Sequence, residues 1–173
     1  MPSNSAVTMM IYREDLISDA GEQAAFKAAY GYDLAPATTW EQYYDIAEFF
    51  TRDAGETLAG EVLEQPIYGV TIAGKRHEAA VFEWINYANS FGGGVVSPEG
   101  ELVVDSAGSV ESLEYMSSLG EFSPPGYTSA TWDEVTAQLD PQIQRQLWQE
   151  LMVECEQRGL GMVIFSHQQA LLR

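Results

Sequence analysis

Residues 74–94, GKRHEAAVFEWINYANSFGGG, bring together the side chains best suited to binding a polar ligand. Lys75, Arg76 and His77 come where a predicted strand ends and a predicted helix begins. The first N–H groups of a helix have no partner within the helix, and ligand sites often form at such junctions. The spacing therefore predicts that these three side chains face a binding cleft, with a solvated loop as the alternative.

Aromatic side chains follow on the same predicted helix, at Phe82, Trp84, Tyr87 and Phe91. Such rings pack against the apolar C–H face of a sugar, while neighbouring polar groups form hydrogen bonds with its hydroxyls. Helical spacing also places aromatic residues in a protein core. The pattern indicates a carbohydrate site near the helix start, with core packing as the alternative for each ring.

Several kinds of catalytic site are not indicated. The chain has no G-x-x-x-x-G-K-[ST] phosphate loop and no G-x-S-x-G nucleophile elbow. His77 and His167 have no second ligand nearby at metal spacing, so a zinc site is not predicted. Cys155 lies on the apolar stripe of a predicted helix, which favours a core position over a nucleophilic one. The sequence therefore predicts a protein that is not an enzyme and needs no cofactor.

Charge and composition exclude further classes. The 173 residues include 26 acidic and 8 basic side chains, for a formal net charge of -18. A surface of this sign repels phosphates, so neither nucleic acid nor an anionic membrane is an expected partner. No apolar run approaches the length of a membrane span, and the N-terminus lacks the pattern of a signal peptide. One cysteine allows no internal disulfide.

Periodicity predicts a helix-rich α/β domain around a small, mostly buried sheet. Capping-box patterns, Thr39 with Gln42 and Thr131 with Glu134, mark two helix starts. A loop or short helix is expected at 54–66. Helices are predicted at 21–30, 38–53, 75–94, 106–119 and 132–139, and strands at 7–13, 67–74 and 101–106.

The last segment is a predicted helix followed by a strand. Asp140 is placed to cap the helix and Pro141 to occupy its first position, while Gly159 ends it. An apolar stripe on this helix comprises Ile143, Leu147, Leu151 and Cys155, and the strand reads GMVIFSH. These apolar faces need a cover, so we expect residues 140–173 to pack into the same domain.

Residues 2–139 resemble the second lobe of the family 1 extracellular solute-binding proteins, the carbohydrate receptors of ABC importers. The matching stretches are PSNSAVTMMIYREDL, GYDLAPATTWEQYYDIAEFF, YGVTIAGKRHEAAVFEWINYANSFGG, SLEYMSSLGEFSPPG and TWDEVTAQL. The resemblance implies one lobe of a two-lobed clamp that closes on a sugar outside the cytoplasm and delivers it to a permease. It implies a ligand site at Lys75, Arg76, His77 and Phe82, with Gly93 at the end of the same helix. Trp132 matches a family position, with packing as the alternative, and the aromatic pattern adds Trp84 to the expected site.

From Leu139 onward the sequence instead resembles an ABC transporter ATPase. LDP is similar to its D-loop, and GMVIFSH to the strand that ends in the switch histidine. Asp140 and His167 would then be remnants of a nucleotide site. Without a phosphate loop such a remnant cannot hydrolyse ATP, because that catalysis depends on positioning and charge neutralisation. The chain is thus interpreted as a chimera, and the alternatives are a recombined or engineered fold without activity and an inactive ATPase fragment.

Overall fold

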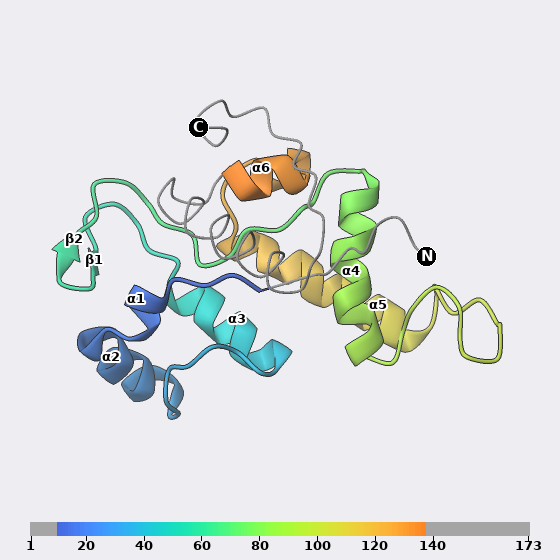
Figure 1. Ribbon diagram of the computed structural model, residues 1–173, viewed down its shortest axis with the longest axis horizontal. Helices are drawn as coiled ribbons and strands as arrows, with labels where there is room; N and C mark the ends of the chain where they lie inside the picture. Colours follow the sequence, from blue (N-terminus) through green and yellow to red (C-terminus); the bar gives the residue numbers. More distant parts are fainter. Residues whose placement is uncertain (1–9, 138–173) are drawn as a thin grey trace, which may run out of the picture.

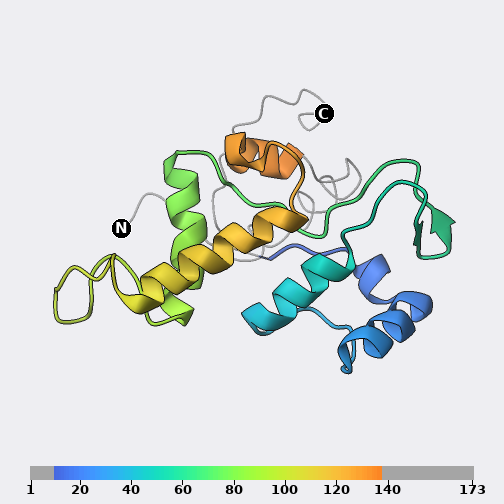
Figure 2. The ribbon, with the colours of Figure 1, turned by 180° about the vertical axis from the view of Figure 1, so that it is seen from behind.

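The computed structural model describes residues 10–137, so Asp140, Cys155, His167 and the predicted helix and strand of 140–173 lie outside the described residues. The described chain is rich in helices, as expected, and carries a small two-stranded sheet (Figures 1 and 2). The prediction of a mostly buried sheet is wrong, because Leu58 is the one buried residue of these two strands. Its elements are α1 (Glu14–Ile17), α2 (Ala20–Tyr30), α3 (Trp40–Phe49), β1 (Thr57–Leu58), β2 (Glu61–Val62), α4 (Glu78–Ser90), α5 (Ala107–Ser118), the 3-10 turns η1 (Leu119–Phe122) and η2 (Tyr127–Ser129), and α6 (Trp132–Ala137).

Side-chain caps start the longer helices, which confirms the helices predicted near 21–30, 38–53, 75–94 and 106–119. The capping box at α3 is shifted by one residue, because the Gln42 side chain accepts from the Thr38 N–H and not from the Thr39 N–H. Backbone N–H groups donate to the cap side chains in the pairs Glu22 to Asp19, Gln42 to Thr39, Ala79 to His77 and Ser109 to Ser106.

The sheet is a hairpin within residues 54–66, where the sequence predicted a loop or a short helix. β1 and β2 are antiparallel, with Thr57 opposite Val62 and Leu58 opposite Glu61. Ala59 and Gly60 form the two-residue turn, and both have positive φ, 48° and 83°. Two-residue turns with this backbone match the twist of a hairpin. The prediction failed because Ala59 stands at the first turn position, where Asn before Gly would have indicated a hairpin.

The strand predicted at 67–74 is wrong, although the segment is buried and extended. Val70 and Ile72 are 8% and 1% exposed. One antiparallel bridge joins Ile67 to Arg52. Beyond it the backbone partners are turns: the Val70 N–H donates to the Phe122 carbonyl, and the Gly74 N–H to that of Tyr127. An apolar run thus marks a segment that crosses the core without joining a regular sheet.

The strand predicted at 101–106 is also wrong. A single antiparallel bridge joins Val96 to Leu102, and a turn closed by the Ser106 N–H and the Val103 carbonyl follows at once. The result is an arm that projects from the end of α4 and α5 (Figure 1). Of the strand predicted at 7–13, residues 10–13 are described and contain no strand.

Two clusters of buried residues form the core. In the first, Phe26 is fully buried, stacks on Tyr30 at 4.6 Å between ring centroids and meets the edge of Phe49 at 5.1 Å. In the second, Tyr87 is 2% exposed and packs against Trp40 at 4.7 Å. The helix α3 contributes to both clusters. Its residues Ile46 and Phe49 pack against the first cluster, and Ala47 belongs to the second.

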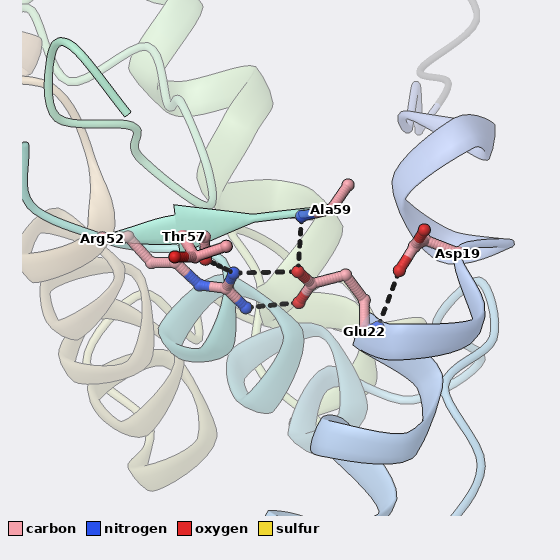
Figure 3. Close-up of polar contacts among 5 residues, drawn as sticks. All are labelled: Asp19, Glu22, Arg52, Thr57 and Ala59. Atoms are coloured by element: carbon pink, nitrogen blue, oxygen red, sulfur yellow. Dashed lines mark hydrogen bonds and ion pairs between the residues drawn. The ribbon is translucent and has the colours of Figure 1, made fainter. Parts of the chain in front are cut away.

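A buried polar network fixes the hairpin to α2 (Figure 3). Arg52 donates to both carboxylate oxygens of Glu22 and to the Thr57 carbonyl. The Ala59 N–H donates to the same carboxylate at 2.7 Å, so Glu22 binds the base of the hairpin and its turn together. The hydrogen bonds from Arg52 hold the pKa of Glu22 below its ordinary value.

Candidate functional site

The site residues predicted at the start of α4 are organised around His77. Its Nδ1 accepts a hydrogen bond from the Ala79 N–H at 3.2 Å and so caps the helix. The imidazole ring meets the Trp132 ring edge to face, with 5.7 Å between centroids. His77 thus holds the helix start and the indole in one place.

Phe82 and Trp132 extend this contact into an aromatic cluster. Their centroids lie 6.0 Å apart, with 47° between the ring planes. Phe82 is 53% exposed and Trp132 is 45% exposed. We call His77, Phe82 and Trp132 the aromatic site. Two exposed rings beside an imidazole offer apolar surface on which the C–H face of a flat ligand can pack.

Backbone hydrogen bonds bring the two distant parts of the chain together at this site. The Lys75 N–H donates to the Ala130 carbonyl at 3.0 Å, and the Gly74 N–H to the Tyr127 carbonyl at 3.2 Å. Gly74 is required there, because a Cβ at this position would lie 2.8 Å from the Tyr127 ring. The segment that leads into α4 is therefore fixed against the turn that leads into α6.

The start of α6 shows one of the two hydrogen bonds of the second predicted capping box. The Thr131 N–H and hydroxyl both donate to the Glu134 carboxylate, the N–H at 2.7 Å. These hydrogen bonds, with a smaller contribution from the charge of Lys75, lower the pKa of Glu134 to about 2. Trp132 therefore stands on a defined first turn, next to a carboxylate that is ionised at neutral pH.

Two predicted ligand residues serve the interior instead. Trp84 is 9% exposed, and its indole N–H donates to the Ser112 hydroxyl at 2.8 Å. Gly93 packs against the start of α5, where an added Cβ would lie 2.4 Å from the Ser109 nitrogen. Both positions join α4 to α5. Of the seven residues predicted, Lys75, Arg76, His77, Phe82 and Trp132 are exposed around one place, and Trp84 and Gly93 are not part of it.

One unusual group escaped prediction, the carboxyl group of Glu83. Burial raises its pKa, and the hydrogen bond it accepts from the Tyr87 hydroxyl at 2.7 Å partly opposes that shift. Burial also raises the pKa of Tyr87. The sequence did contain a signal for this group: Glu83 lies four residues before Tyr87, so both fall on the same apolar face of the helix.

The described residues include no group of three or more His, Cys, Asp or Glu side chains arranged to hold a metal ion. Within the same part of the chain, no helix combines the length and apolar character needed to cross a bilayer. Comparison of the chain with models of protein families, with curated sequences and with solved structures found no match.

Proposed function

We propose that this chain is a carbohydrate-binding lobe of an ABC-importer solute receptor and that its ligand binds at the aromatic site. The observation that carries the proposal is the contact of Phe82 and Trp132 beside His77, with both large rings about half exposed. A ligand that covers exposed aromatic rings removes their apolar surface from water, which favours binding. Polar side chains beside the rings then orient the ligand.

The receptor architecture adds a second element to the proposal. In a two-lobed receptor each lobe supplies part of the contacts, and the lobes close around the ligand. A single lobe is then a weak binder, because one side of the sugar stays in water. The parent receptor would act outside the cytoplasm and deliver the sugar to a permease, and the chain itself would catalyse no reaction.

The test is titration of the full-length chain with neutral mono- and oligosaccharides, followed by calorimetry and by tryptophan fluorescence. Phe82→Ala should weaken binding. Val81→Ala is the matched control, because Val81 is the preceding residue of α4 and is 50% exposed. Equal binding by both variants would place the site elsewhere, and no binding by the wild type would favour a recombined fold without activity.

A nucleotide arm separates the proposal from the ATPase-fragment alternative. Any ligand that binds only the folded state stabilises it by RT ln(1 + [L]/Kd) and so raises the melting temperature. Mg-ATP should leave the melting temperature unchanged. A shift with Mg-ATP that disappears in His167→Ala would support the ATPase fragment and contradict the receptor lobe.

A further inference from the structure

The positive charges of the described residues fall into two groups. Arg13, Lys27 and Arg52 each form an ion pair with a carboxylate, at Asp15, Asp33 and Glu22. Lys75 and Arg76 form no ion pair within 4.0 Å in the same part of the chain, and both are exposed. The charge of Lys75 lowers the pKa of Glu134 only slightly, so this carboxylate does not neutralise the two cations.

Both cations lie at the aromatic site. They directly precede His77 in the chain, and the backbone of Lys75 is hydrogen-bonded to Ala130, two residues before Trp132. The site thus offers two rings that can pack on a ligand and two charged groups that can donate to an anion.

Carboxylates complete the surroundings of the site. Glu78 lies one helical turn before Phe82 on α4, so its side chain is a neighbour of that ring. Glu134 is already held by Thr131. Carboxylates accept hydrogen bonds from sugar hydroxyls but repel a ligand anion, so an anionic ligand must direct its charge toward Lys75 and Arg76 and its hydroxyls toward the acids.

From this arrangement we infer that the aromatic site is selective for an acidic sugar, a uronic acid or a short chain of uronic acids. Its carboxylate binds Lys75 and Arg76, and its ring packs against Phe82 and Trp132. This inference rests on the proposed carbohydrate-binding function and specifies its ligand class.

The experiment compares trigalacturonic acid with galactotriose, a neutral sugar of the same length and ring configuration, on the full-length chain. Calorimetry at low and at physiological salt should show tighter binding of the acid, weakening as salt screens the charges. The double variant Lys75→Gln/Arg76→Gln should weaken binding of the acid by roughly tenfold or more and weaken binding of the neutral trimer far less. Lys27→Gln, which removes one exposed lysine from α2, is the control for overall charge and is compared with the single variants Lys75→Gln and Arg76→Gln.

Glu78→Gln gives a test of opposite sign. Removing this negative charge should tighten binding of trigalacturonic acid, whereas for a neutral sugar it only replaces one hydrogen-bond acceptor with another group. If galactotriose binding depends on Phe82 and the acid is not preferred, the inferred selectivity is wrong and the proposed carbohydrate site is still supported. Binding of neither trimer would overturn both. If Lys27→Gln loses as much affinity for trigalacturonic acid, the preference for the acid comes from the overall charge of the protein, and the inference about this site is wrong.

Discussion

Arg52 forms a bidentate ion pair with Glu22, thirty positions earlier in the chain, and the pair lies in the interior (Figure 3). The two side chains are 13% and 8% exposed. The guanidinium also lies over the Phe49 ring, 4.9 Å from its centroid. Because the carboxylate also binds the hairpin turn, one ion pair connects α2, the end of α3 and the hairpin.

Arg52→Met should destabilise the chain strongly, because it leaves the carboxylate of Glu22 buried without its cation. Breaking one side of a buried pair costs about 3–5 kcal/mol. Urea unfolding of the full-length chain measures this loss. The double variant Glu22→Gln/Arg52→Met should recover part of it, since no unpaired charge then remains.

Lys27→Ala is the contrasting case, since Lys27 and Asp33 form an ion pair with side chains 62% and 83% exposed. Solvent screens such a pair, and its loss should leave the urea midpoint unchanged. If Lys27→Ala and Arg52→Met lose similar amounts of unfolding free energy, burial does not explain the importance of the Arg52–Glu22 ion pair.

Glu83 should make stability fall as the pH rises. Its folded-state pKa lies above the ordinary value of 4.5, so the unfolded chain releases this proton at lower pH than the folded chain does. Over the window from 4.5 up to the folded-state pKa the unfolded state binds fewer protons, and the free energy of unfolding therefore decreases with pH. Glu83→Gln cannot ionise and keeps an acceptor for the Tyr87 hydroxyl, so it should remove this decrease.

The measurement is the difference in unfolding free energy between wild type and Glu83→Gln from pH 4 upward. Glu22 provides the internal control, because its folded-state pKa is lowered and its contribution is lost as the pH falls. The Glu22→Gln difference should thus have the opposite slope. A Glu83→Gln difference that does not change with pH would show that this carboxyl group titrates alike in both states.

Local signals in the sequence predicted the helices well. Asp19, Thr39 and Ser106 are caps whose partners lie within three residues, so the chain segment alone contains the information. The extended segments were predicted poorly, because strand formation depends on partners elsewhere. Val70 faces Phe122, and nothing near Val70 in the sequence announces that its backbone partner is a turn.

The candidate site shows the same division. The approach of Lys75 and His77 to a binding surface was predicted from a helix start, and the resemblance added Trp132. Trp84 has the same residue type as Trp132 but packs inside, because its position on α4 faces Ser112 on α5. Only the packing of one helix on another decides which of two tryptophans is available to a ligand.

Gly93→Ala should destabilise the fold without altering the aromatic site directly. The new Cβ would lie 2.4 Å from the Ser109 nitrogen and 2.7 Å from the Gly108 carbonyl carbon, and backbone atoms of a capped helix cannot move away freely. Overpacking of this kind costs about 1–3 kcal/mol. Urea unfolding gives the loss, and sugar titration of the folded fraction should match the wild type.

Gly21→Ala is the control for that substitution. Gly21 lies within α2, and its Cβ would approach only the Asp19 side chain, at 3.1 Å. Alanine is favoured over glycine in a helix by roughly 0.5–1 kcal/mol, so this variant should be neutral or slightly stabilised. Weaker sugar binding by folded Gly93→Ala, with Gly21→Ala unaffected, would return Gly93 to the ligand site.

Ala59→Asn should stabilise the hairpin. Ala59 has φ of 48°, a left-handed conformation that costs a residue with a Cβ roughly 1–2 kcal/mol. Asn tolerates this conformation better, and Asn-Gly is the preferred pair for a two-residue hairpin turn. The N–H of residue 59 still donates to Glu22, so the expected gain is part of that cost, about 0.5–1 kcal/mol in urea unfolding. Ala28→Asn, an exposed site in the helix α2, tests the same exchange in an ordinary helical conformation and should lose stability, because Asn is a poorer helix former. If Ala59→Asn and Ala28→Asn both lose stability by similar amounts, the positive φ of residue 59 does not favour Asn over Ala, and the expected gain is wrong.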